Sequence, residues 1–279
     1  MHDESIRIRE WLIPFAFVIC AGWAIWHIPA YIIDFIPPEN PSLLDQMTEL
    51  LLRKDITPEL SGLFGGYADI LDWSALILMP ILFGFGVRTV RCYKMEFQRW
   101  RSVDRIAMFV GRITMVLIIS MTSIMLYEVF LRYVFEAPTL WANELTLWIA
   151  GFVFLFSGFY AMQQRCHIRI FLLYEAVPRW VQHIFDTISA ILICFFAFFL
   201  IYGSYKQVFI VKFYRWEMFG TAFDPPIPAT LQPMVLIVVS LIAIQSVINL
   251  ISDWNLEPTA TDDIDADEIE AIKRSVGEK

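Results

Sequence analysis

The sequence predicts an all-α integral membrane protein, a helical bundle of about six transmembrane helices. Of its 279 residues, 58% are hydrophobic and only 18% are charged, whereas a soluble domain carries about a quarter charged residues. The mean hydropathy is high, at +0.58. The apolar residues also gather into runs, and a hydrocarbon core about 30 Å thick needs about 20 such residues in a helix. Composition and run length therefore favour a membrane bundle over a water-soluble core.

Six apolar runs follow one another along the chain, and each is predicted to be a membrane span. The run 73–87 is the shortest, and the run 106–126 contains Arg112. The first run follows two arginines, as a signal peptide would, but it exceeds the usual apolar region of about 7–15 residues and no A-x-A-like cleavage site follows it. We therefore expect a retained anchor. The six predicted spans are 11–33, 73–87, 106–126, 145–162, 187–205 and 225–252.

The distribution of lysine and arginine predicts that both termini face the cytoplasm. Of the 21 basic residues, 14 lie in the segments on the side of the termini and 6 in the segments on the other side. The segment 88–105 contributes six of the 14. Basic residues of membrane proteins concentrate in the cytoplasmic connections. The chain is thus predicted to be a multi-pass inner-membrane protein with its N-terminus and its C-terminus inside.

Three regions are expected along the chain. Residues 1–95 form an N-terminal transmembrane hairpin whose outer connection, about 34–70, is rich in proline and glycine. Within it, residues 43–53 have helical spacing of apolar residues and are expected to lie on the membrane surface. Residues 96–254 hold four further spans. Residues 255–279 form an acidic cytoplasmic tail, which is either a solvated end or a partner-binding segment.

The outer ends of the third and fourth spans carry the most notable polar residues. Glu128 and Arg132 stand four residues apart, which favours pairing on one helix face. Tyr133 and Trp141 suit the aromatic belt at a membrane surface. Glu144 opens the fourth span, where the positive end of a helix favours an acid. It either serves this electrostatic role or pairs with Arg132 or a partner protein.

Two glycines and two arginines have other predicted roles. Gly151 and Gly158 lie seven residues apart on the fourth span, and small residues on one face allow close packing of helices in lipid. Arg105 and Arg112 share a face near the inner end of the third span. Because an arginine stem is long enough to bring the guanidinium to the membrane surface, both are expected to contact lipid headgroups.

Several function classes are not favoured by the sequence. The four histidines, residues 2, 27, 167 and 183, do not form an opposed pair inside the membrane of the kind that ligates haem. The four cysteines form no CxxC pair and are expected to be reduced. There is no phosphate-binding G-x-x-x-x-G-K-[ST] loop, no nucleophile–base constellation and no basic groove for nucleic acid. We therefore expect no enzyme, no cofactor and no nucleic-acid partner.

A spaced series of residues from the third span to the sixth resembles one known family. The series comprises Arg132-Tyr133-Val134-Phe135, Pro138, Trp141, Glu144-Leu145, Trp148, Gly158, Ala161, His167-Ile168-Arg169, Pro178 and Asp224-Pro225-Pro226-Ile227-Pro228. With these residues, the region of about 104–252 is similar to the DctQ-like small membrane subunit of the TRAP (tripartite ATP-independent periplasmic) transporters. The hairpin 1–95 is a departure, because the usual small subunit has four helices.

The resemblance implies a scaffold subunit in a bacterial inner membrane. Its partners would be a large multi-span membrane subunit, a periplasmic substrate-binding protein and membrane lipids. The transporter would import small organic acids with sodium, whose ligands lie in the large subunit. Residues Arg132, Tyr133, Trp141, Glu144 and His167 would contact the large subunit or the binding protein. The alternatives are a redox or quinone-linked membrane anchor and an assembly or regulatory membrane protein; the substrate and the role of the hairpin stay open.

Overall fold

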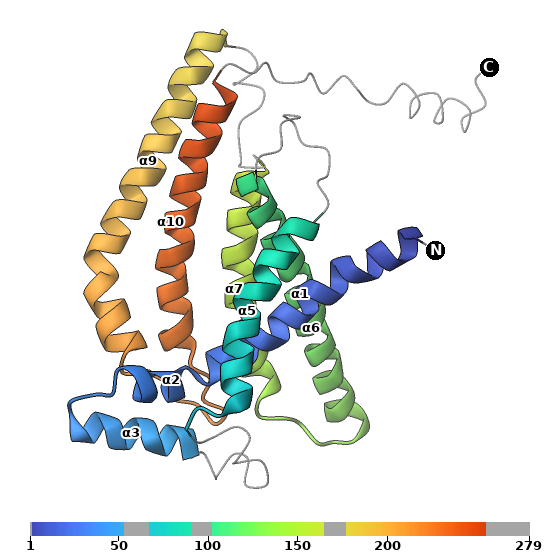
Figure 1. Cartoon of the computed structure of the whole chain (residues 1–279), viewed down its shortest axis with the longest axis vertical. Helices are drawn as coiled ribbons and strands as arrows, with labels where there is room; N and C mark the ends of the chain where they lie inside the picture. The colour runs from blue at the N-terminus through green and yellow to red at the C-terminus, as the bar shows by residue number, and fades with distance from the viewer. Residues whose placement is uncertain (1, 53–66, 91–101, 165–176, 255–279) are drawn as a thin grey trace.

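The computed structural model describes residues 2–52, 67–90, 102–164 and 177–254. Throughout these residues the regular structure is helical, with no strand (Figure 1). The prediction of an all-α fold is therefore confirmed. The helices are α1 (His2–Trp26), α2 (Ile28–Phe35), α3 (Pro41–Leu52), α5 (Ile70–Thr89), α6 (Ser102–Val134), α7 (Ala142–Gln163), α9 (Arg179–Tyr205), the π-helix η1 (Lys206–Phe213) and α10 (Ile227–Asp253).

The membrane spans agree with those predicted, with one difference in the first. Five helices of the described chain are long and apolar enough to cross a membrane: α5, α6 from Asp104, α7, α9 together with η1, and α10. The sixth candidate is a pair, Glu10–Trp26 and Ile28–Phe35, bent by 56°. Pro29 stands at the start of α2, and a proline both lacks a backbone N–H and clashes with the preceding helical turn. The first predicted span is therefore broken at His27.

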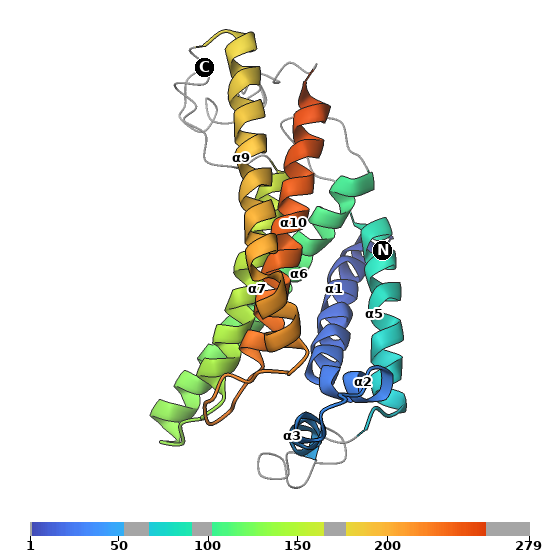
Figure 2. The same cartoon turned by 90° about the vertical axis from the view of Figure 1, so that its left-hand side faces the viewer.

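The helices form a row instead of a closed bundle. The main contacts run from α9 to α10, α7, α6, α1 and α5, and α5 also touches α6. Figure 1 shows α9 and α10 at one side of the molecule and α5, α1 and α6 towards the other, and Figure 2 shows α1 and α5 side by side. Consequently most of each span faces outward, and only 11–22% of the apolar window of each of the five spans is buried.

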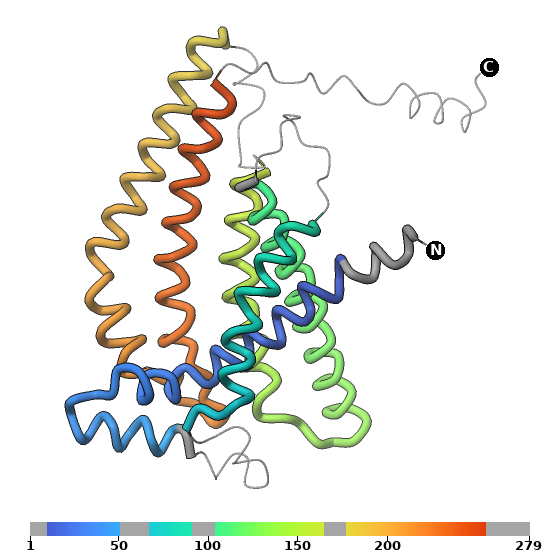
Figure 3. Tube along the Cα trace, viewed as in Figure 1, coloured from blue at the N-terminus to red at the C-terminus, as the bar shows by residue number. Residues whose placement is uncertain are grey.

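The two ends of the molecule, taken along the helix axes, differ in structure. The trace in Figure 3 brings α2, α3, the start of α5, the connection 135–141 between α6 and α7, and the connection 214–226 before α10 to one end of the molecule. We call this the α3 end. The last residues of α5, α7 and α10 lie at the opposite end. Which end faces the cytoplasm stays a prediction; the predicted topology places the α3 end outside.

Helix α3 explains the apolar spacing noted at residues 43–53. The Asn40 side chain accepts hydrogen bonds from the Ser42 backbone N–H, at 3.1 Å, and from its hydroxyl, at 2.8 Å, and Pro41 occupies the first helical position, where a missing N–H costs nothing. Met47 is fully buried, whereas Glu49 is exposed. The predicted amphipathic helix is confirmed for Pro41–Leu52, and its place on the membrane surface stays a prediction.

Apolar clusters fasten the N-terminal helices to the rest of the row. Towards the opposite end, Ile13 of α1 packs with Phe109 and Ile113 of α6. At the α3 end, Ile32 of α2 and Met47 of α3 pack with residues that precede and begin α10. The predicted boundary at 95/96 lies outside the described residues, as does the tail 255–279. Within the described chain, the N-terminal helices pack directly on α6, on Trp148 of α7 and on the start of α10.

Candidate functional site

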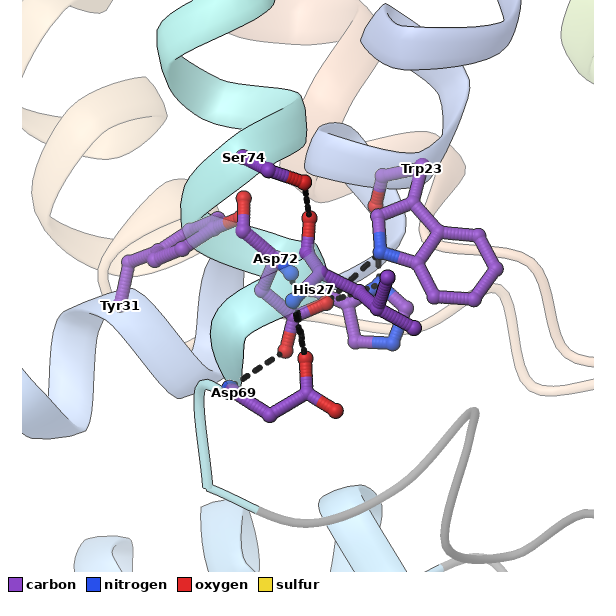
Figure 4. A network of polar contacts seen from close by, with 7 residues as sticks. Trp23, His27, Tyr31, Asp69, Asp72 and Ser74 are labelled. Atoms are coloured by element: carbon purple, nitrogen blue, oxygen red, sulfur yellow. Dashed lines mark hydrogen bonds and ion pairs between the residues drawn. The ribbon is translucent and has the colours of Figure 1, made fainter.

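Three polar groups tie helix ends together at the α3 end, and the largest surrounds Asp72. Asp72 lies on the first turn of α5 and is 4% exposed. Its Oδ1 accepts a hydrogen bond from the Trp23 indole Nε1–H at 2.7 Å and lies 3.6 Å from His27 Nδ1. Figure 4 shows Trp23, His27 and Tyr31 gathered around this aspartate. One carboxylate therefore joins α5 to the bend in the first span.

The same aspartate also caps its own helix. Asp72 Oδ2 accepts from the Asp69 backbone N–H at 3.0 Å, while Asp69 Oδ1 accepts from the Leu71 and Asp72 backbone N–H groups. This reciprocal capping box satisfies N–H groups that have no partner inside the helix. In addition, the Tyr31 hydroxyl donates to the Asp72 backbone carbonyl at 2.6 Å. The start of α5 is thus fixed both from within and from α2.

His27 has a defined tautomer and a buried edge. The His27 Nδ1–H donates to the Trp23 carbonyl at 2.9 Å, and the two rings stack with centroids 4.8 Å apart. Nδ1 therefore carries the proton, because a carbonyl only accepts. His27 Nε2 is buried and has no hydrogen-bond partner within the described part of the chain. The sequence left Asp72 and His27 without a role; the signals that could have identified them are the four-residue spacing of Trp23 and His27 and an aspartate at the edge of an apolar run.

The second group surrounds Glu128 at the end of α6. Glu128 is 2% exposed, and its Oε1 accepts from Arg132 Nη2 at 2.6 Å and from Arg132 Nε at 3.2 Å. Its Oε2 accepts from the Thr139 backbone N–H at 3.0 Å and from the Thr139 hydroxyl. The predicted pairing of Glu128 with Arg132 is confirmed. The carboxylate also holds the connection 135–141 against α6.

The third group joins α7 to the connection before α10. Glu144, in the first turn of α7, accepts a hydrogen bond from the Thr221 hydroxyl at 2.6 Å. The structure thus gives Glu144 a partner 77 residues away along the chain, while Arg132 binds Glu128. Trp141 packs on Tyr127 with ring centroids 6.3 Å apart.

The remaining predicted contact residues differ in their surroundings. Tyr133 is 77% exposed on the last turn of α6, so its ring is available to a lipid or a protein. His167 lies outside the described residues. The contacts predicted for Arg132, Tyr133, Trp141, Glu144 and His167 with other subunits stay predictions.

Arg112 lies in a different environment from the one expected. Its side chain is buried, with Nη2 3.8 Å from Glu10 Oε2 and the guanidinium 5.2 Å from the centroid of the Trp11 ring. The difference arises because α1 crosses α6 at this point and covers the arginine. Arg105, two turns earlier on α6, is exposed and donates to the Arg88 carbonyl at 3.4 Å. That Arg105 and Arg112 contact lipid headgroups stays a prediction.

The two predicted packing glycines also differ. A Cβ at Gly151 would lie 2.4 Å from Leu231 Cδ1 of α10, whereas a Cβ at Gly158 would meet, among the described residues, Ile242 Cδ1 at 3.8 Å. Gly151 therefore marks a close approach of α7 to α10, and Gly158 leaves ordinary space. Gly86 is closer still to its neighbour, because a Cβ there would lie 2.2 Å from the Phe109 ring. Gly86 lies in a short apolar run, and its position there did not predict a close contact with another helix.

An open cavity of about 600 Å³ lies beside these groups, between α3 and the segment 211–224. Gln46, Glu49 and Leu50 line it from α3, and Arg215 and Thr221 line it from the other side. Among the described residues, no three histidine, cysteine, aspartate or glutamate side chains are grouped to hold a metal ion. His27 stands between α1 and α2, and His183 lies near the start of α9; Figure 1 shows α2 and the start of α9 at opposite ends of the molecule. The polar groups around Asp72, Glu128 and Glu144 thus hold helix ends together beside an open cavity.

Comparison with known protein families gives a match to the second half of the chain. The family model described as "Tripartite ATP-independent periplasmic transporters, DctQ component" matches residues 121–255. The matched segment begins within α6 and includes α7, α9 and α10, so that the N-terminal helices α1, α2, α3 and α5 lie outside it. No curated protein and no solved structure gives a match.

Proposed function

Because residues 121–255 belong to the DctQ family, this chain is the small membrane subunit of a TRAP transporter, and we propose that it is a scaffold which braces the large membrane subunit. The family is one of transporter subunits and not of enzymes. Its partners are a large membrane subunit and a periplasmic binding protein. In the proposal, the chain holds the large subunit in the inner membrane and helps to dock the binding protein.

The open row of helices is the observation that carries the scaffold proposal. A transporter that moves solute by itself needs a site enclosed between helices near the middle of the membrane. Here the main contacts follow a single path from α9 to α5, and broad apolar faces are turned outward. Such a row is suited to lying along another membrane protein. The large subunit would then cover part of its exposed surface.

The transported substrate and the coupling ion belong to the proposal as well. We propose import of small organic acids driven by sodium, with the ligands for both in the large subunit. The scarcity of ionisable groups supports this division, because no aspartate, glutamate or lysine lies near the middle of any of the six predicted spans. Ionisable residues at that depth mark ion and substrate pathways.

The proposed arrangement in the membrane follows the basic residues. We place both termini in the cytoplasm, the α3 end in the periplasm and the acidic tail 255–279 inside. The hairpin 1–95 is an addition to the four-helix core 96–254 and widens the scaffold. Its packing on α6 through Ile13, Phe109 and Ile113 supports a fixed attachment.

Co-purification tests the proposal. The tagged chain, extracted from its native membrane in mild detergent, should bring down a protein of about a dozen spans in equal amount. Proteoliposomes holding both chains and the binding protein should take up an organic acid only with an inward sodium gradient. If the chain purifies without a multi-span partner, and uptake does not depend on it, the scaffold proposal is wrong.

A further inference from the structure

An open apolar groove of about 650 Å³ lies between α6 and the first half of α7. Met121 and Met125 line it from α6, and Leu147 and Ala150 line it from α7. Thr146 also belongs to the lining; it is 7% exposed, and its hydroxyl donates to Met125 Sδ at 3.4 Å, which joins the two helices. Among the described residues that line the groove, none carries a charge. The groove therefore presents an uncharged surface within two membrane spans.

The groove and the N-terminal hairpin lie on opposite faces of the α6–α7 pair. Two residues nine positions apart on a helix are separated by about two and a half turns and so point to opposite sides. On α6, Thr122 of the groove stands nine positions after Ile113, which packs on Ile13 of α1. On α7, Leu147 of the groove stands nine positions before Phe156, which packs on the same cluster. The hairpin thus covers one face of the pair and leaves the groove uncovered.

The exposed surface continues from the groove along α7. Leu147, Phe154 and Gly158 follow one another at seven and four residues, which places them on one face of the helix; we call this the α7 face. Leu147 is 54% and Phe154 77% exposed. From Asn143 in the groove to Gly158, fifteen residues at about 1.5 Å each extend about 22 Å. This length exceeds one leaflet of a hydrocarbon core about 30 Å thick, so it fits a helix that crosses the bilayer better than one lipid chain.

We propose that the groove and the α7 face seat a transmembrane helix of the large membrane subunit. The inference rests on the proposed function and adds which face of the chain makes the contact. Every residue that lines the groove lies within the family segment 121–255. The hairpin instead packs on Phe109 and Ile113, which precede that segment. The extra hairpin is therefore compatible with a partner held on the surface that the family segment builds.

The chemistry of the groove indicates what kind of helix it accepts. Between helices in lipid there is little hydrophobic drive, and close packing becomes important, so a hollow between two spans favours a helix with a protruding apolar side chain. Met121 and Met125 can adapt to its shape, because methionine has a flexible side chain. A charged residue of the partner would find no counter-charge in the lining. The exposed Asn143 carboxamide, in the first turn of α7, can exchange hydrogen bonds with the partner.

The test places a photo-crosslinking amino acid at single positions of the whole complex in its native membrane. At Leu147 it should give an adduct with the large subunit. Ile77, 59% exposed on α5 of the hairpin, is the matched control and should give none; Leu192, 60% exposed on α9, examines the other edge of the chain.

A second measurement fills the groove. Ala150→Trp should lower the amount of large subunit that co-purifies by about fivefold or more, because a bulky side chain in a packed contact is unfavourable. Ile77→Trp, which adds the same ring to the exposed face of the hairpin, should change it by less than about twofold. The amount of the small subunit in the membrane is measured for both variants, and the ratio of the two chains is compared.

Three results would overturn the proposed seat. Adducts with the large subunit at Ile77 or Leu192 but none at Leu147, with normal co-purification of Ala150→Trp, would place the contact elsewhere and leave the proposed function standing. An adduct at Leu147 with a second copy of this chain, or with lipid alone, would assign the groove to that occupant. If the wild-type chain brings down no large subunit, the proposed function is wrong and the seat with it.

Discussion

At the scale of single residues, the polar side chains of this chain act mainly on the ends of helices. Asp72 and Glu128 are both almost fully buried and each satisfies several donors on different segments. A buried carboxylate is costly unless its oxygens accept hydrogen bonds. These two therefore stabilise one arrangement of the helix ends and disfavour others.

Asp72→Asn should destabilise the chain measurably. Whichever way the amide is oriented, its NH2 group faces a donor, either the Trp23 indole N–H or the Asp69 backbone N–H. Leaving a buried donor without an acceptor costs about 1–3 kcal/mol. Unfolding of the purified protein in detergent, followed by tryptophan fluorescence, would measure the change. Asp34→Asn, an exposed acid of α2, is the control, and equal stability of the two variants would contradict the role given to Asp72.

A comparison of Glu144→Gln with Thr221→Val separates two roles for Glu144. If the carboxylate serves only to hold Thr221, the two variants should reduce complex assembly and uptake to the same small extent, because an exposed hydrogen bond contributes about 0.5–1.5 kcal/mol. We expect Glu144→Gln to have the larger effect, as a contact with another subunit requires. Uptake and pull-down at matched expression give the measurement. Equal effects of the two variants would mean that Glu144 serves only to hold Thr221.

At the scale of elements, close approach between helices depends on particular small residues. In lipid there is little hydrophobic drive between helices, so packing of backbones becomes important. Gly151 lets α10 approach α7 with Leu231 over its Cα, and Gly86 accommodates the Phe109 ring between α5 and α6. Gly158 lies on the same helix as Gly151 but has ordinary space beside it.

The glycine pair on α7 therefore offers a matched test. Gly151→Val should loosen the contact of α7 with α10, at a cost of about 1–3 kcal/mol for overpacking, whereas Gly158→Val should cost less than half as much. Thermal unfolding of the two variants in one detergent would compare them. A larger loss at Gly158 would contradict the assignment of the close approach to Gly151.

Helix α1 shows how one element changes the surroundings of another. Arg112 was expected at the lipid headgroups because its own helix suggested that position. In the structure α1 crosses α6, so Glu10 and Trp11 lie against the arginine and bury it. Residue spacing could not predict this contact, because Glu10 and Trp11 lie about a hundred positions before Arg112 in the sequence.

At the scale of the whole molecule, the two ends along the helix axes are distinct, and the sequence predicts which of them faces the cytoplasm. The polar groups around Asp72, Glu128 and Glu144 and the cavity beside α3 lie at the α3 end. The last residues of α5, α7 and α10 lie at the opposite end (Figures 1 and 3). The basic residues predict that this opposite end is cytoplasmic.

Single cysteines in a background without the native ones test this orientation. Glu136→Cys, exposed in the connection 135–141, should react with a membrane-impermeant maleimide added to intact spheroplasts. Asp186→Cys, near the start of α9, should react only after the membrane is opened. The reverse pattern would invert the predicted topology.

The sequence by itself predicted about six spans, the helical class and the likeness to the DctQ family, because apolar run length and local residue spacing indicate each; the structure gives five spans and a bent pair, and residues 121–255 match the family model. It also predicted the pair Glu128–Arg132, since both residues lie on one helix face. Only the tertiary structure decided the break at His27, the partners of Asp72 and Glu144, the burial of Arg112 and the cavity beside α3. Each of these depends on which distant helices lie side by side, and in a membrane chain that choice rests on small residues and a few polar contacts with no periodic pattern.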